Sequence, residues 1–192
     1  MQKFISALCF MFAFSAVQAC DDFANLPEEK QTPQGLYLTA KQAYEMKTQN
    51  PDQVYFVDVR TQSEVEFLGM PENADANIPY MIDDLLEWND EKGRFRKIPN
   101  SNFSLDLASR LEEVGLDKDA PIILMCRSGS RSSKAAALLN KLGYTKAYTV
   151  VDGFEGDKAE EGPHKGKRVV NGWKNSDLPW TYNLTRDKMY IE

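Results

Sequence analysis

Three short apolar segments, with helical patterns between them, constrain the fold of this chain more than any other feature. The segments VYFVDV (54–59), PIILM (121–125) and AYTVV (147–151) are almost continuously apolar, which is typical of strands covered on both faces. Between them, apolar residues recur at helical spacing in residues 104–114 and 135–142. Because strands that alternate with helices form parallel sheets, we predict an α/β fold with a central, mostly parallel β-sheet flanked by helices on both faces.

Shorter elements surround these segments. A strand is expected at 35–38, before a helix that begins with a capping box formed by Thr39 and Gln42. Thr61 and Glu64 form a second capping box, which predicts another short helix. The sequence ANIPYM at 76–81 predicts a further strand. Residues 82–103 are charged and irregular, and we expect a loop there with one turn of helix.

The composition divides the chain into four parts. Residues 1–19 have the pattern of a signal peptide, and residues 20–34 form a polar lead-in with two prolines. Residues 35–182 form one domain, and residues 183–192 a short C-terminal tail. A chain of 192 residues is long enough for a single domain with its own hydrophobic core.

The predicted signal peptide indicates export. Lys3 gives a positive start, residues 4–17 are apolar, and the small residue Ala19 ends the segment. We therefore expect a periplasmic location. Cys20 follows the predicted cleavage point and has two interpretations: it begins the mature chain, or it carries a lipid anchor, because AVQAC resembles a bacterial lipobox.

The composition also argues against several classes of function. The formal net charge of −6 disfavours nucleic acid as a partner, because phosphate binding needs a basic surface. No stretch after residue 20 is long and apolar enough to predict a membrane span. His164 is the only histidine and Cys126 the only cysteine after Cys20, too few for the four ligands of a structural zinc site. We predict no metal and no cofactor.

Cys126 stands where parallel sheets bind ligands, at the carboxyl end of a predicted strand. The turn from Cys126 to Arg131 leads directly into a helix, whose first N–H groups lack partners and carry partial positive charge. Gly129 allows the backbone to curl around an anion, and the small residues Ser128 and Ser130 leave room for it.

Two arginines, Arg127 and Arg131, add full charges to this turn. A free thiol has a pKa near 8.5, and a helix N-terminus with nearby cations lowers that pKa to about 3.5–7.5. The pattern therefore indicates a reactive thiolate at Cys126. The alternative, a buried core cysteine, is common but does not account for two arginines within five residues.

Two motifs together resemble one known family. CRSGSRS after an apolar strand resembles the active-site loop of rhodanese-like sulfurtransferases, and DVRTQSEVEFLGMPENADANIP at 58–79 is similar to a second signature of that family. The resemblance covers residues 35–182 and implies a rhodanese-like fold. It also implies a single-domain sulfurtransferase of the thiosulfate type, which the predicted signal peptide makes an exported one. Its partners would be a small anionic sulfur donor, such as thiosulfate, and an acceptor, either cyanide or a thiol.

The resemblance also implies roles for individual residues. Cys126 would be the catalytic nucleophile and would carry the transferred sulfur as a persulfide. The donor and the terminal sulfur would be bound by the turn that contains Arg127, Ser128, Gly129, Ser130 and Arg131. Asp58 and Arg60 would support the pocket without reacting.

The spacing of the turn distinguishes this chain from related phosphatases and arsenate reductases. Those enzymes have Cys-x5-Arg, whereas here the arginine follows in Cys-x4-Arg and Ser132 stands at the sixth position. The smaller turn suits one sulfur atom better than a phosphate. Met70 stands where the upstream signature often has a histidine, which affects local packing and not the nucleophile.

An insert at 155–171 leaves part of the function open. It adds Lys165, Lys167 and Arg168 after the predicted core, and it is either a solvated loop, a gate for the donor or a docking segment for a periplasmic protein partner. The alternative function is accordingly a non-enzymatic periplasmic sulfur carrier or an anion-binding partner module.

Overall fold

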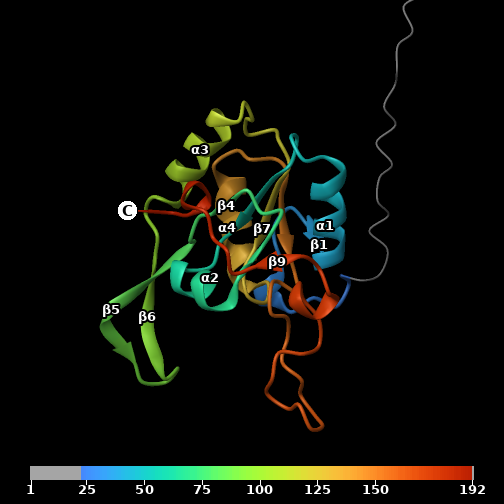
Figure 1. Ribbon diagram of the computed structural model, residues 1–192, viewed down its shortest axis with the longest axis vertical. Helices are drawn as coiled ribbons and strands as arrows, with labels where there is room; N and C mark the ends of the chain where they lie inside the picture. The colour runs from blue at the N-terminus through green and yellow to red at the C-terminus, as the bar shows by residue number, and fades with distance from the viewer. Residues whose placement is uncertain (1–22, 192) are drawn as a thin grey trace, which may run out of the picture.

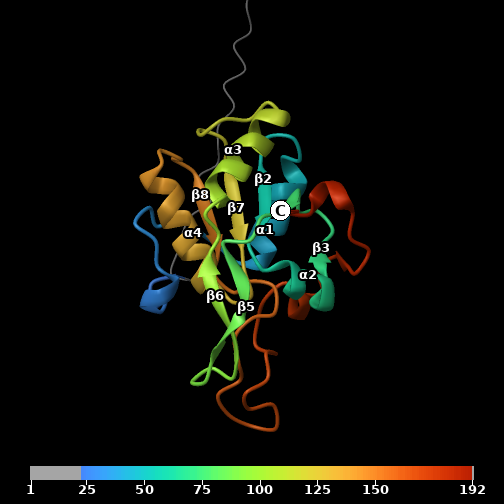
Figure 2. The ribbon, with the colours of Figure 1, turned by 90° about the vertical axis from the view of Figure 1, so that its left-hand side faces the viewer.

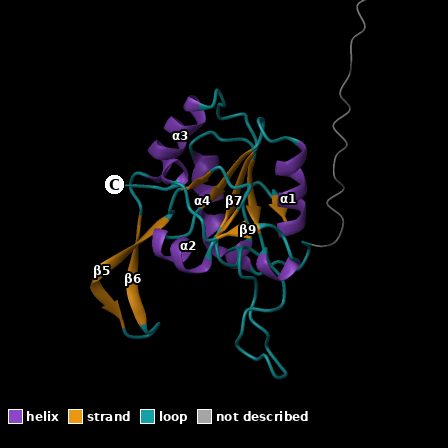
Figure 3. Ribbon diagram, in the orientation of Figure 1, coloured by secondary structure: helices purple, strands orange, loops and turns teal. Residues whose placement is uncertain are grey.

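The computed structural model describes residues 23–191; the predicted signal peptide and Cys20 lie outside the described residues. The described chain forms a five-stranded sheet with the order β1–β8–β7–β2–β4, in which all neighbouring strands are parallel (Figures 1 and 3). Its strands are β1 (Tyr37–Leu38), β2 (Tyr55–Asp58), β4 (Ala76–Asn77), β7 (Ile122–Met125) and β8 (Ala147–Val150). The three apolar segments of the sequence are therefore the three central strands of the sheet.

Helices cover both faces of this sheet. They are α1 (Ala40–Gln49), α2 (Gln62–Leu68), α3 (Phe103–Glu113) and α4 (Ser130–Lys141). Residues of α1 and α2 pack against one face, and residues of α3 and α4 against the other. The predicted α/β fold, a mostly parallel sheet between two helical layers, is confirmed.

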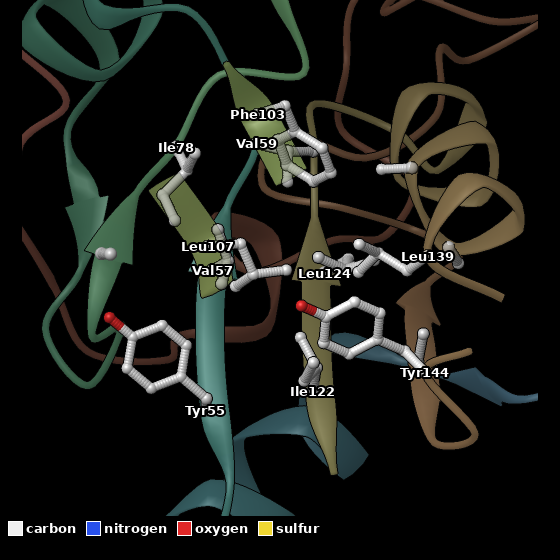
Figure 4. Close-up of a cluster of buried hydrophobic side chains, with 14 of the residues drawn as sticks. Tyr55, Val57, Val59, Ile78, Phe103, Leu107, Ile122, Leu124, Leu139 and Tyr144 are labelled. Atoms are coloured by element: carbon white, nitrogen blue, oxygen red, sulfur yellow. The ribbon is translucent and has the colours of Figure 1, made fainter. Parts of the chain in front are cut away.

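Alternate residues along the central strands divide the core into two layers. Figure 4 shows the layer on the α3 and α4 side, where Val57 and Leu124 meet Leu107 and Leu139. On the opposite face, Phe56 packs against the fully buried Trp173, with 5.4 Å between the ring centroids. Because both faces are covered, the strands have continuous apolar sequences and not alternating ones.

Local sequence signals begin the first two helices as predicted. The Thr39 hydroxyl accepts a hydrogen bond from the Gln42 amide, and the Gln42 side chain accepts one from the Thr39 amide. Thr61 and Glu64 repeat this reciprocal arrangement at the start of α2. Each capping box provides partners for amides that have none within the helix.

The expected loop at 82–103 is wrong in its main feature. Residues of β5 (Met81–Asn89) and β6 (Arg94–Pro99) form an antiparallel hairpin that projects from the domain (Figures 1 and 2). The register shifts between Asp84 and Trp88, so residues 85–87 bulge out of the ladder and break the alternation that would have indicated a strand. Leu85 and Leu86 in this bulge are 69% and 96% exposed, so the bulge does not pack on the core.

The ends of the described chain pack on the same domain. A 3-10 turn at Glu28–Lys30 lies against α4, where the Ser133 hydroxyl donates a hydrogen bond of 2.7 Å to the Glu29 carbonyl. Two further turns, Lys174–Ser176 and Arg186–Lys188, and the small sheet of β3 (Met70–Pro71) with β9 (Trp180–Thr181) complete the fold. Tyr190 is buried in the core layer of α3 and α4.

In the part of the chain that the structure describes, no helix has both the length and the hydropathy needed to span a bilayer.

Candidate active site

Cys126 directly follows β7, a central strand of the sheet. Its side chain is almost fully buried, with 1% of the residue exposed, and the thiol is not in a disulfide. Figures 1 and 2 show the β5–β6 hairpin and the loop at 155–172 extending beyond the end of the sheet where β7 ends. The sulfur therefore lies at the carboxyl edge of the strands, where parallel sheets bind their ligands.

The turn after Cys126 folds back so that its backbone faces the sulfur. The Gly129 amide donates a hydrogen bond of 3.2 Å to the Cys126 Sγ. Gly129 has φ of 99° and is the N-cap of α4, so the sulfur lies at the helix N-terminus. The sequence predicted this curled turn at a helix start, and the structure has it.

Ser132 is a contact of the sulfur that the sequence did not assign to the site. Its hydroxyl lies 3.5 Å from Cys126 Sγ and 2.9 Å from the Gly129 carbonyl oxygen, and it accepts a hydrogen bond of 2.8 Å from the buried Thr149 hydroxyl. The only available signal was its position, six residues after the cysteine. The hydroxyl is thus a second polar group, after the Gly129 amide, within hydrogen-bonding distance of the sulfur.

These contacts favour the thiolate. Burial by itself acts to raise the pKa of Cys126, but the charge of Arg131 and the hydrogen bonds from Ser132 and from the Ser128 amide outweigh it, so that the pKa of the thiol lies below its ordinary value. A lowered thiol pKa increases the thiolate fraction at neutral pH, and the thiolate is the nucleophilic form.

Arg131 is held by an acidic residue of α2. Its Nη1 and Nη2 donate hydrogen bonds of 2.6 Å each to the two carboxylate oxygens of Glu64. Burial alone would raise the pKa of Glu64, but the hydrogen bonds and charge of Arg131, together with Lys97, lower it to about 2. The guanidinium is thus fixed near the sulfur, and Glu64, predicted only as a helix cap, also positions this charge.

The remaining residues of the turn are half-buried. Arg127, Ser128 and Ser130 all lie between the buried core and the exposed surface. The Arg127 carbonyl accepts hydrogen bonds from the amides of Glu155 and Gly156, at 3.0 and 3.2 Å. Among residues 23–191, no carboxylate pairs with the Arg127 side chain within 4.0 Å.

A second loop packs directly on the turn. The Phe154 amide donates a hydrogen bond of 2.9 Å to the Cys126 carbonyl. Gly153 brings this loop so close that a Cβ there would lie 2.6 Å from the same carbonyl oxygen. A Cβ on Gly129 would lie 2.3 Å from the Val151 carbonyl oxygen. Two glycines therefore allow the backbone contact that fixes the shape of the turn.

Asp58 and Arg60 form a fully buried ion pair at the end of β2, the neighbour of β7. The Arg60 Nε donates a hydrogen bond of 2.9 Å to Asp58 Oδ1, and its Nη2 donates one of 2.7 Å to the Gly69 carbonyl. The guanidinium also stacks on the Phe154 ring, 3.9 Å from its centroid. The pair thus ties β2 to the loop that packs on the Cys126 turn.

The insert at 155–171 reaches this loop through Arg168. Its Nη1 donates a hydrogen bond of 2.5 Å to the Gly156 carbonyl. The Gly156 amide in turn donates a hydrogen bond to the Arg127 carbonyl. Lys165 and Lys167 lie on the exposed part of the insert. Arg168 is thus the insert cation whose side chain contacts the loop beside the turn.

The described residues contain no group of three or more histidine, cysteine or acidic side chains arranged to hold a metal.

Comparisons with known proteins show the family to which the chain belongs. The family model of the rhodanese-like domain matches residues 39–160. Uncharacterized proteins of Rickettsia rickettsii and Rickettsia prowazekii are 30% identical over 145 residues, which cover 76% of this chain and 96% of each relative. The crystal structure of Rv0390 from M. tuberculosis has 32% sequence identity and a TM-score of 0.58, and the match covers 77% of this chain and 97% of that one. The chain belongs to the family of proteins with a rhodanese-like domain.

Proposed function

We propose that this protein is a sulfurtransferase that carries a sulfane sulfur on Cys126. The observation that carries the proposal is the hydrogen bond from the Gly129 amide to Cys126 Sγ at the N-terminus of α4. A sulfur held in this way is stabilised as an anion, before the reaction as a thiolate and afterwards as a persulfide. Arg131 supports the same charge from the first turn of the helix.

Thiosulfate is the donor that fits this site, because it is small and anionic. The Cys126 thiolate attacks the outer sulfur of thiosulfate, a new S–S bond forms, and the S–S bond of the donor breaks so that sulfite leaves with the electron pair. Cyanide then attacks the terminal sulfur of the persulfide, and thiocyanate leaves as the thiolate is restored. A thiol acceptor would take the same sulfur and become a persulfide itself.

The turn residues have distinct parts in this scheme. The amides from Arg127 to Arg131 would surround the terminal sulfur, and the half-buried Arg127 would attract the donor. Arg131 already pairs with Glu64, which holds the guanidinium beside the turn but offsets part of its charge, so Arg131 attracts an incoming donor less than Arg127 does. Asp58 and Arg60 would hold the neighbouring strand in place and take no part in the chemistry.

The test is a thiosulfate:cyanide assay that measures thiocyanate, run on the full chain beside Cys126→Ser. We expect turnover by the native protein and none by the variant. Equal rates in the two proteins would remove Cys126 as the nucleophile. Uptake of one sulfur, a mass gain of about 32 Da, with negligible turnover would favour the alternative, a carrier that delivers sulfur to a protein partner.

We further propose that the protein acts in the periplasm. The support is the signal-peptide pattern of residues 1–19. Fractionation of cells that express the full chain tests this location, and comparison with Cys20→Ala tests lipidation, because loss of a lipid would move the protein from the membrane to the soluble fraction. Recovery of the uncleaved chain in the cytoplasm would contradict export.

A further inference from the structure

The ion pair that holds Arg131 continues into the base of the β5–β6 hairpin. Lys97 Nζ on β6 lies 3.9 Å from Glu64 Oε2, the same oxygen that accepts a hydrogen bond from Arg131 Nη1. Lys97 also pairs with Asp83 on β5. Charges of alternating sign therefore run from Asp83 through Lys97 and Glu64 to Arg131.

These side chains are shielded enough for their charges to act on one another. The exposed fraction of the side chain is 15% for Lys97 and Glu64, 17% for Arg131 and 23% for Asp83. Charges that are partly buried are screened less by water and salt than charges on an open surface. Removal of the charge of one residue in this row therefore changes the electrostatic potential at the next residue.

The sign of each effect on the sulfur follows from the order of the row. Glu64 offsets part of the Arg131 charge that stabilises the Cys126 thiolate. The positive charge of Lys97 partly neutralises the Glu64 carboxylate, so the Arg131 charge stabilises the thiolate more strongly. The negative charge of Asp83 partly neutralises Lys97 and therefore destabilises the thiolate.

Other charged groups lie around the site on other elements. Arg127 belongs to the turn and Arg168 to the insert, and the Asp58–Arg60 pair lies at the end of β2. Among residues 23–191, none of these four forms an ion pair with Lys97 or Asp83. Substitutions in the hairpin therefore leave these groups in place.

We propose that Lys97 is a positioning residue for sulfur transfer: acting through Glu64 and Arg131, it stabilises the Cys126 thiolate, and Asp83 limits this effect. The inference rests on the proposed function of Cys126 and extends it to the hairpin. It makes the β5–β6 hairpin part of the reactive site, although the hydrogen bonds to the sulfur come from Gly129 and Ser132 and not from the hairpin.

The test is an ultraviolet titration of the thiolate in the full chain, with the curve of the matching Cys126→Ser protein subtracted so that only Cys126 contributes. We expect Lys97→Gln to raise the midpoint by about 0.5 pH unit and Asp83→Asn to lower it by a similar amount. Lys97→Arg keeps the charge and should titrate like the native protein. Denaturant unfolding checks that each variant is folded.

Opposite shifts separate this proposal from a structural role. Lys97→Gln and Asp83→Asn break the same ion pair, so a hairpin that merely needs anchoring would change in the same direction in both variants. Shifts of the same sign, or no shift in either variant, would overturn the proposal. The titration requires no sulfur transfer, so opposite shifts in a protein without sulfurtransferase activity would contradict the proposed function alone.

Discussion

Gly129→Ala is the substitution that should damage the turn most. A residue other than glycine at φ of 99° is strained by about 1–2 kcal/mol. The new Cβ would also lie 2.3 Å from the Val151 carbonyl oxygen and 3.0 Å from its carbon, so the turn or the end of β8 has to move by about 1 Å. Overpacking of this kind costs about 1–3 kcal/mol, which gives a total loss of about 2–5 kcal/mol.

The same movement displaces the Gly129 amide, the donor to Cys126 Sγ. Removal of one such donor lowers the rate of an enzyme about 10²–10³-fold. Urea unfolding and the thiosulfate:cyanide assay measure the two effects separately.

Gly143→Ala is the matched control. Gly143 has φ of 91°, but the nearest atom to its Cβ would be the flexible end of Lys118 at 4.0 Å. The Gly143→Ala variant should lose only about 1–2 kcal/mol, the backbone strain estimated above for a non-glycine residue at positive φ, and it should keep the native rate of sulfur transfer. If Gly129→Ala equalled Gly143→Ala in stability and rate, the close contact between the turn and Val151 would have no role in shaping the site.

Three further predictions concern stability. The pKa of Glu64, lowered from 4.5 to about 2, stabilises the fold by about 3 kcal/mol above pH 4.5, and this stabilisation is lost as the pH falls toward 2. In urea unfolding, the free energy of unfolding of Glu64→Gln should be lower than that of the native protein and should depend less on pH over that range. Burial raises the pKa of Asp152 to about 6, so its ionisation destabilises the fold by about 3 kcal/mol as the pH rises from 3.8 through 6; in Asp152→Asn this dependence should be absent. Leu124→Ala, in the fully buried centre of β7, should lower the free energy of unfolding by about 2–5 kcal/mol, and a loss below 1 kcal/mol would mean that the core closes around the gap.

The sheet and the early helices could be predicted because their signals are local. The apolar segments that became β2, β7 and β8 are covered on both faces, and the capping boxes at Thr39 and Thr61 lie within four residues of sequence. The β5–β6 hairpin could not be predicted in the same way, because its bulge breaks the alternation and its charged strands pack little on the core.

The residues of the site also differ in whether they could be predicted from local sequence. The cysteine, the glycine and the small residues of the turn are contiguous, so the curled backbone at the helix start could be predicted from them. Glu64 and Lys97 lie far from Cys126 in sequence, and only the packing of α2 and the hairpin beside α4 brings them to Arg131. Lys30 is another such residue: it comes from the polar lead-in, and its Nζ pairs with Asp157 of the insert at 2.8 Å.

Peptide mass mapping after treatment with thiosulfate tests the central proposal most directly. The account predicts that the peptide with Cys126 gains about 32 Da, one sulfur atom, and that cyanide removes it. In Cys126→Ser no peptide of the folded domain should gain this mass. A native protein whose Cys126 stays unmodified while thiocyanate is produced, or whose added sulfur resides at another position, would contradict the account.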